Sequence, residues 1–438
     1  MTRPPLSRRS FLTLSGAGLA ALGLAACSAP PGPNIAETAA VAPVDPDFIK
    51  KNFAGPGGAA VGAGLPITVG ATLLLSTFQA YYGQLSLRGM ELAAEQIAAA
   101  GGPQFTFVPK DVAASTTAGA DAVRDFASRK IGMVLAANVF NVGSMVGPLA
   151  QFKILGIDPG GGTSTLFQKL PYVWGARALA PNDTFPIGLQ YMTAALPDAR
   201  KITLLNTNSG DFSAALEADF RNAVSKFGPK GAEVSTVVYI ATNAGGDFTA
   251  ALTEARRIKP DVFFTPLYGS DPPAFMKKFA TSGLEAKVIG SDYASSTAEI
   301  AGSAMNGYVF AADYFDSNPR NDWGTYFVST YYAKHKEIPD YFPANYYEST
   351  FLLWELVKRV IKKGGDPQDG EQLQNALLDD PTFSSVYGTG SPTGRLEFDP
   401  VTHTLATRPM GIFEVRDTVP KLLASGDIGG RDFSLSKP

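Results

Sequence analysis

The chain of 438 residues contains very little cysteine and histidine. Its only cysteine is Cys27, and its only histidines are His335 and His403. One thiol cannot form an internal disulfide, and a metal site needs more ligands than these three residues supply. The histidines lie in the stretches Lys-His-Lys and Thr-His-Thr, which favours surface positions over a catalytic triad. We therefore expect no metal, no cofactor and no catalytic residues.

The chain also has no excess of basic residues. Lys and Arg number 37 and Asp and Glu number 40, for a formal net charge of −3, so no surface for nucleic acid is expected. Two uncharged stretches, 54–87 and 131–152, are interrupted by proline, glycine and polar residues. Such interruptions favour buried strands with their flanks over membrane spans. The glycine-rich segment 158–164 lacks the lysine of a phosphate-binding loop.

The N-terminus has the parts of a secretory signal. Arginines near the start precede an apolar segment, residues 11–26, that is short for a membrane span of about 20 residues. The segment 24–27, LAAC, resembles the bacterial lipobox, in which the cysteine receives a diacylglycerol and becomes the mature N-terminus. The segment 7–12, SRRSFL, resembles the twin-arginine export signal, with the general secretory route as the alternative. We therefore expect a lipid on Cys27 that anchors the protein outside the cytoplasm.

Strands and helices alternate along the rest of the chain. Hydrophobic residues make up 45% of the sequence and charged residues 18%, enough for a large core and two domains. Buried strands alternate with helices of about 10–15 residues, which predicts parallel sheets covered on both faces. The alternation forms two series, 67–175 and 201–311, before a mainly helical region and a β-rich end around 394–415. The pattern predicts two α/β lobes of similar topology.

Three segments resemble a known family. Residues 72–102, TLLLSTFQAYYGQLSLRGMELAAEQIAAAGG, are similar to the first strand, loop and helix of the leucine/isoleucine/valine-binding proteins, the type I periplasmic solute-binding proteins of ABC importers. Residues 260–284, PDVFFTPLYGSDPPAFMKKFATSGL, and 211–220, DFSAALEADF, are similar to parts of the second lobe of these proteins. The resemblance covers residues 67–415. It implies two Rossmann-like lobes joined by a three-strand hinge, which close over a small ligand at the carboxyl ends of the strands.

The expected domains follow from the composition and the resemblance together. We expect a signal peptide at 1–26, a flexible Pro-, Gly- and Ala-rich tether at 27–64, a first lobe at 65–186 and 313–397, a second lobe at 187–312 and 398–420, and a C-terminal tail at 421–438.

The resemblance also implies a ligand site with residues from both lobes. These residues are Tyr82, Asn138, Val139, Phe140, Gly160, Gly161, Gly162, Thr163, Phe212, Tyr268 and Asp292. Asp292 corresponds to an acid that pairs with the ligand's ammonium, and Tyr82 to an aromatic residue that covers the ligand. Val139 and Phe140 replace serine hydroxyls that hold an α-carboxylate, so a carboxylate would depend on the loop 160–163 and nearby asparagines.

Other interpretations of these residues remain open. Phe140 and Phe212 can be core aromatics, and Phe212 replaces a tyrosine of the family. Asp292 can be the N-cap of a helix. Aromatic residues near position 342 are interpreted as core. The ligand then has a cationic or amide nitrogen and a hydrophobic or aromatic body.

The resemblance implies a binding protein and not an enzyme. We expect a lipid-anchored solute-binding protein that captures a small amino acid, amide or related amine-bearing compound and delivers it to ABC permease subunits. The alternative is a sensory or cell-wall regulatory lipoprotein with the same fold and a degenerate cleft, which the missing hydroxyls favour. A secreted enzyme ranks third.

Overall fold

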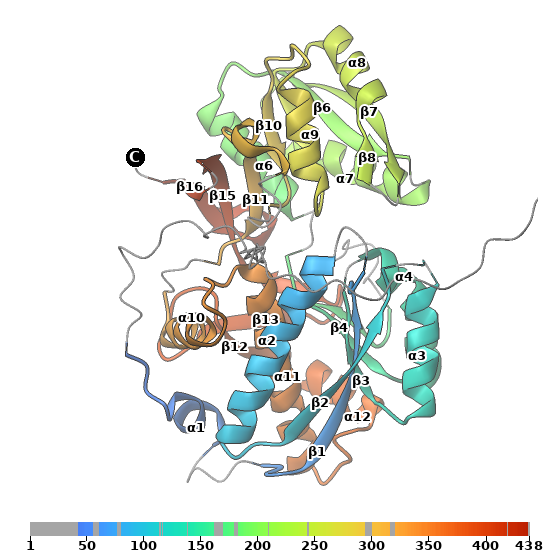
Figure 1. Cartoon of the computed structure of the whole chain (residues 1–438), viewed down its shortest axis with the longest axis vertical. Coiled ribbons are helices and arrows are strands. Elements are labelled where there is room, and N and C mark those ends of the chain that lie inside the picture. Colours follow the sequence, from blue (N-terminus) through green and yellow to red (C-terminus); the bar gives the residue numbers. More distant parts are fainter. Residues whose placement is uncertain are drawn as a thin grey trace, which may run out of the picture.

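The structure, a computed structural model, arranges the chain in two lobes, one above the other in Figure 1. It describes residues 43–55, 61–76, 80–113, 115, 117–137, 139–161, 170–178, 183–208, 210–242, 245–293, 300–315, 320–417 and 419–436, without the side chains of 139–141 and 211–212. Among these residues no helix is long and apolar enough to span a membrane.

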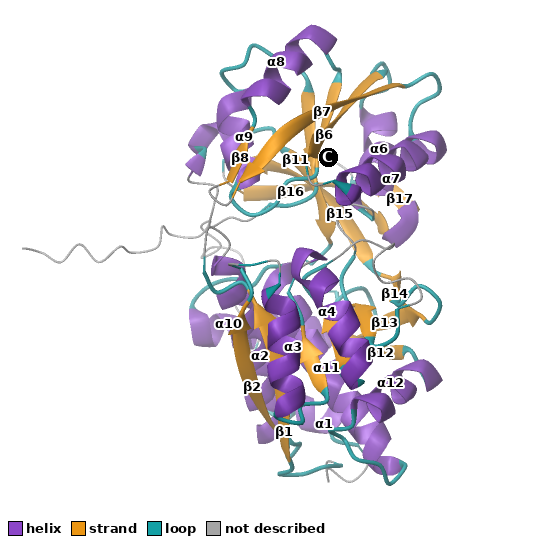
Figure 2. Ribbon diagram, turned by 90° about the vertical axis from the view of Figure 1, so that its right-hand side faces the viewer, coloured by secondary structure: helices purple, strands orange, loops and turns teal. Residues whose placement is uncertain are grey.

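The first lobe is built on a parallel sheet in the order β2-β1-β3-β4-β5. Its strands are β1 (Pro66–Leu73), β2 (Gln104–Asp111), β3 (Met133–Leu135), β4 (Leu155–Asp158) and β5 (Val173–Gly175). Its helices are α2 (Ala80–Ala99), α3 (Ala118–Ser128), α4 (Val139–Phe152), α10 (Asp322–His335), α11 (Tyr341–Lys362) and α12 (Gly370–Asp379). Helix α2 packs along α11 (Figure 1), and α3 packs against α4 (Figure 2). Residues on both faces of β1 are buried, as expected for a parallel sheet between helices.

The second lobe has a larger sheet in the order β17-β16-β15-β11-β10-β9-β6-β7-β8. Its strands are β6 (Lys201–Thr207), β7 (Glu233–Thr242), β8 (Gly245–Asp247), β9 (Val262–Thr265), β10 (Lys287–Gly290), β11 (Val309–Asp313), β15 (Pro409–Arg416), β16 (Val419–Asp427) and β17 (Arg431–Leu435). Its helices are α6 (Thr184–Ala195), α7 (Asp211–Phe227), α8 (Thr249–Ile258) and α9 (Asp271–Phe279), with short 3₁₀ turns at Gly302–Met305 and Ile428–Gly430. The central strands are parallel, and β8, β15, β16 and β17 are antiparallel to their neighbours.

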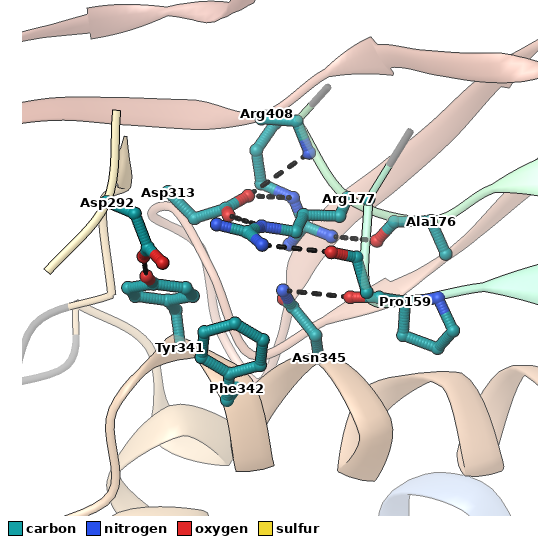
Figure 3. A network of polar contacts seen from close by, with 12 residues as sticks. Pro159, Ala176, Arg177, Asp292, Asp313, Tyr341, Phe342, Asn345 and Arg408 are labelled. Atoms are coloured by element: carbon teal, nitrogen blue, oxygen red, sulfur yellow. Dashed lines mark hydrogen bonds and ion pairs between the residues drawn. The ribbon is translucent and has the colours of Figure 1, made fainter. Parts of the chain in front are cut away.

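The chain crosses between the lobes three times, which confirms the predicted fold class. The crossings follow β5, β11 and β14 in the order of the elements along the chain. A small antiparallel sheet of β12 (Thr382–Ser385), β13 (Gly394–Asp399) and β14 (Thr404–Thr407) lies beside the first lobe, where β14 contacts β5 and β12 contacts α11. Residues of all three crossings, Arg177, Asp313 and Arg408, lie close together in the region enlarged in Figure 3.

Three expected domain boundaries are wrong in detail. The boundary between 186 and 187 falls within α6, which packs against α7 and β11 and belongs wholly to the second lobe. The boundary at 397–398 falls within β13, so the second lobe resumes at β15. The expected tail at 421–438 instead supplies most of β16 and β17, because its backbone groups pair with β15 and with each other.

Part of the expected tether is also ordered. Helix α1 (Phe48–Phe53) lies against the first lobe, with the ring of Phe48 stacked on Tyr326 at a centroid distance of 5.1 Å. The ring of Phe53 lies 4.7 Å from that of Trp323, and the Lys358 ammonium donates to the Phe53 carbonyl at 2.9 Å. The high content of Pro, Gly and Ala in this region predicted a flexible tether, although a few apolar side chains pack the helix against the lobe.

One of the two histidines is buried, contrary to the prediction. The His403 ring stacks on Trp174 at a centroid distance of 3.9 Å, and its Nδ1 lies 3.2 Å from the Val173 carbonyl oxygen. Burial lowers the pKa of His403. The partner tryptophan is distant in sequence, so the polar neighbours of His403 gave no indication of this contact.

Candidate functional site

Loops from both lobes meet at the carboxyl ends of the strands. Tyr82 lies in the first turns of α2 in the first lobe, and Gly269 and Asp292 follow β9 and β10 in the second lobe. The Tyr82 hydroxyl donates to Asp292 Oδ2 at 2.5 Å and accepts from the Gly269 N–H at 2.8 Å. The structure therefore brings together two residues, Tyr82 and Asp292, that the resemblance assigned to one site.

Asp292 is buried, with 1% of its surface exposed. Its second carboxylate oxygen, Oδ1, accepts a hydrogen bond from the Tyr341 hydroxyl at the start of α11, which Figure 3 shows beside it. The Tyr308 hydroxyl donates to the backbone carbonyl of Asp292 at 3.0 Å. Among the described residues, no Lys, Arg or His side chain forms an ion pair with this carboxylate. Its side-chain hydrogen bonds among the described residues therefore come from phenols, and the buried Arg177 guanidinium acts on it electrostatically without forming an ion pair.

The helix-cap interpretation of Asp292 stays open, because residues 294–299 lie outside the described residues and Ile300 already belongs to a helical turn. The carboxylate contacts hydroxyls of the opposite lobe, Tyr82 and Tyr341. Asp292 therefore acts as a contact between the lobes.

Aromatic rings line the first-lobe side of this contact. The ring centroids of Tyr81 and Tyr82 are 4.1 Å apart, those of Tyr82 and Phe342 are 4.2 Å apart, and those of Phe342 and Tyr341 are 4.8 Å apart. Sequence reasoning did not assign Tyr341 to the site and placed Phe342 in the core. The available signal was the run of aromatic residues at the start of a helix, directly after Asp340.

The tyrosine hydroxyls around Asp292 remain protonated. Burial, reinforced by the charge of Asp292, raises the pKa of Tyr82 and of Tyr341 well above the ordinary value of 10.0. Burial also raises the pKa of Tyr268, again with a contribution from Asp292. All three phenols are therefore donors at neutral pH.

Tyr268 differs from the other two in the hydrogen bonding of its hydroxyl. The residue lies three positions after the end of β9, and it is partly buried. Its hydroxyl oxygen is buried and has no hydrogen-bond partner among the described residues. A buried hydroxyl without a partner is unfavourable, so a ligand acceptor at this position would satisfy it.

The described part of the glycine loop after β4 forms hydrogen bonds within the first lobe. The N–H groups of Gly160 and Gly161 donate to Asp158 Oδ1 at 2.8 and 3.2 Å, and not toward the other lobe. The Gly160 carbonyl accepts from the Arg177 guanidinium at 2.9 Å. Gly161 has a φ of +101°, and a Cβ atom there would lie 3.3 Å from Arg177 Cδ, so both conformation and space favour glycine. The two amides assigned to a ligand carboxylate are occupied by Asp158.

Several predicted residues cannot be placed. Asn138, Gly162, Thr163 and Cys27 lie outside the described residues. Val139, Phe140 and Phe212 lie in the first turns of α4 and α7, but their side chains are outside the description. Their roles stay predictions.

Acidic groups cluster near the site without forming a metal centre. Asp340 is the N-cap of α11 and accepts from the Phe342 N–H at 2.9 Å. Burial, with the charge of Asp292 as a further cause, raises the pKa of Asp340 to about 6. Within the described parts of the chain, no group of three His, Cys, Asp or Glu side chains is placed to hold a metal ion.

Comparison with known proteins identifies the family. Residues 66–420 match the profile of the family described as periplasmic binding protein. None of the curated proteins matches significantly. Among solved structures, similar ones are the branched-chain amino acid substrate-binding protein LivJ of Streptococcus pneumoniae (21% identity, TM-score 0.69, covering 83% of this chain and 99% of that one) and the leucine-binding protein LivK of Thermotoga maritima (17%, 0.71, 82% and 98%). A third is an ABC transporter solute-binding protein of R. palustris (20%, 0.69, 85% and 98%). The structures share the two-lobed fold, and the match over most of the sequence shows that the chain belongs to the periplasmic binding protein family.

Proposed function

We propose that this protein is an extracytoplasmic solute-binding protein of an ABC importer that binds a small amine-bearing compound between its lobes. The observation that carries the proposal is Asp292, a buried carboxylate at the meeting of the two lobes with no cation paired to it among the described residues. Buried charges in proteins are normally paired, because desolvation of an isolated charge is costly. A ligand ammonium would supply the missing partner.

The Asp292 carboxylate can accept further hydrogen bonds from such a ligand. An ionised carboxylate accepts about four hydrogen bonds, and the two tyrosine hydroxyls use two of them. The rings of Tyr82, Tyr341 and Phe342 then offer apolar and cation–π contacts to the body of the ligand. A ligand that contacts Asp292 and the first lobe together would favour closure of the lobes.

The solved relatives suggest the size of the ligand. The S. pneumoniae protein is in complex with isoleucine, and the R. palustris protein is in complex with benzoate. Both compounds carry a carboxylate. In the described part of this chain, two amides expected to hold a carboxylate, those of Gly160 and Gly161, donate to Asp158. We infer a compound of similar size in which the amine, and not the carboxylate, dominates recognition.

The proposal includes attachment to the membrane through a lipid on Cys27, export by the twin-arginine route and delivery of the ligand to permease subunits. The lipobox-like and twin-arginine-like segments support the first two steps. Membership of the periplasmic binding protein family supports an extracytoplasmic location and a permease partner.

A second function is a sensory or regulatory lipoprotein with a degenerate site. It is favoured by the hydrogen bonds from Tyr82 and Tyr341 to Asp292, because these contacts join the lobes through protein groups alone. In this case closure would require no solute.

A thermal-shift comparison of matched amines and acids tests the proposal. The pairs are benzylamine against benzoate, and 2-methylbutylamine against isoleucine, each measured with the mature protein at the same concentrations. We expect benzylamine or 2-methylbutylamine to raise the melting temperature and benzoate to leave it unchanged. Stabilisation by benzoate alone would contradict the amine assignment, and no shift with any of the four compounds would favour the regulatory function.

A further inference from the structure

Each of the three crossings between the lobes contributes a buried charge to one cluster. Arg177 lies on the first crossing, Asp313 ends β11 at the second, and Arg408 lies between β14 and β15 at the third. Arg177 Nε donates to Asp313 Oδ2 at 2.9 Å, and Arg408 Nε lies 3.6 Å from Asp313 Oδ1 (Figure 3). The side chains of the two arginines and the aspartate therefore link all three crossings.

The cluster is shielded from solvent. The exposed fractions are 3% for Arg177, 2% for Asp313 and 1% for Arg408. Arg408 also donates to Glu348 Oε1 at 3.0 Å and lies over the ring of Tyr387, with its guanidinium carbon 4.0 Å from the centroid. Interactions between buried charges are little screened by water or salt, so a change in these distances alters the energy strongly.

We call Arg177, Asp313 and Arg408 the hinge cluster. Arg177 belongs both to this cluster and to the wall of the candidate site. Its guanidinium donates to the Gly160 carbonyl at 2.9 Å. The same guanidinium carbon lies 4.7 Å from the ring centroid of Tyr341 and 5.0 Å from that of Phe342. Tyr341 in turn donates to Asp292. The side chain of Tyr341 therefore lies between Arg177 of the hinge cluster and Asp292 of the contact between the lobes.

We propose that Arg177 is a positioning residue that couples the ligand site to the hinge. Rotation of the lobes changes the backbone of the three crossings, because hinge motion is absorbed by a few such residues. A change at the crossings moves Asp313 relative to Arg177, and any movement of Arg177 disturbs the Gly160 carbonyl and the Tyr341 ring. The coupling depends on the two-lobed fold and not on which solute the protein binds.

The test measures the distance between the lobes without added ligand. Cys27 is the only cysteine, so the mature Cys27→Ser chain accepts a pair of spin labels at Glu91→Cys on α2 and Lys277→Cys on α9, both exposed positions in different lobes. The distance distribution from pulsed electron paramagnetic resonance is compared between the labelled parent and its Arg177→Met variant. We expect a broader distribution with more long distances in Arg177→Met.

Two further variants separate coupling from simple stability. Arg177→Lys keeps the charge beside Asp313 but loses the planar fork that reaches Gly160, so we expect a distribution between those of the parent and Arg177→Met. Arg221→Met removes an exposed arginine that is paired with Glu217 on α7 and should leave the distribution unchanged.

The remaining outcomes decide the proposal as well. If Arg177→Met does not fold, Arg177→Met with Asp313→Asn removes the charge left behind and is measured in the same way. A lower melting temperature with an unchanged distance distribution would show that Arg177 only stabilises the fold, and the proposal would then be wrong. Full restoration by Arg177→Lys would equally overturn the role given to the contact with Gly160.

Discussion

Replacing Asp292 by asparagine tests the proposed function most directly. The substitution keeps the size of the side chain and removes its charge. In the protein without ligand, the amide oxygen still accepts from one tyrosine hydroxyl, and the other hydroxyl can rotate to accept from the amide nitrogen. The parent carboxylate also has no paired cation among the described residues, so the variant loses no ion pair within the protein. We therefore expect the melting temperature of the free protein to change little.

Ligand binding should respond much more strongly. Removal of one partner from a buried charge pair costs about 3–5 kcal/mol. At about 1.4 kcal/mol per decade this weakens binding roughly 10²- to 10⁴-fold. A ligand at about 100 times its dissociation constant stabilises the folded protein by about 2.7 kcal/mol, and the variant should lose most of this shift.

Isothermal titration with benzylamine, or with 2-methylbutylamine if only that amine stabilises the protein, measures the effect. The control is Asp247→Asn, which removes an exposed acid of the second lobe and should bind as the parent does. If Asp292→Asn binds the amine as tightly as the parent, Asp292 is a structural contact between the lobes and the amine assignment is wrong.

Three further predictions concern Tyr268, Asp340 and Cys27. Tyr268→Phe removes a buried hydroxyl that has no hydrogen-bond partner among the described residues, so we expect an equal or higher melting temperature. Loss of one hydrogen bond to the ligand should weaken binding about 2- to 10-fold. Unchanged binding in the same titration would exclude contact between this hydroxyl and the ligand. Burial raises the pKa of Asp340 to about 6, so the folded state retains a proton that the unfolded state releases above an ordinary pKa of 3.8. The free energy of unfolding should therefore fall as the pH rises between these values, and urea titrations should show a weaker fall for Asp340→Asn; identical pH profiles would contradict this assignment. Cys27→Ala should leave an unprocessed precursor or release the protein from the membrane, whereas detergent partitioning like that of the parent would rule out the lipid.

The architecture could be predicted from the sequence because it depends on local patterns. Strand and helix periods are visible within short windows, and they gave two α/β lobes with parallel sheets, which the structure confirms. The resemblance then placed Tyr82 and Asp292 in one site, and the structure joins them by a hydrogen bond. Boundaries were less accurate, because β13 and β16 are defined by their pairing partners and not by their own composition.

The hinge cluster could not be predicted from the sequence. Arg177 and Asp313 are 136 positions apart, and no local pattern relates them. Each of them, and Arg408 as well, is a single charge in a mainly apolar stretch beside a strand, which is the one signal that could have marked them. The contact of Tyr341 with Asp292 was not predicted for the same reason. It forms only because the second crossing returns the chain to the first lobe.

The two buried aspartates between the lobes differ in their direct partners. Asp313 has an arginine on either side, Arg177 at 2.9 Å and Arg408 at 3.6 Å, so its charge is compensated within the protein. Asp292, equally buried, receives only tyrosine hydroxyls among the described residues. A buried carboxylate is stabilised by a paired cation, as Asp313 is, or by hydrogen bonds, as Asp158 is by the N–H groups of Gly160 and Gly161. The contrast fits a structural role for Asp313 between the crossings, and it supports the proposal that a ligand supplies the cation that pairs with Asp292.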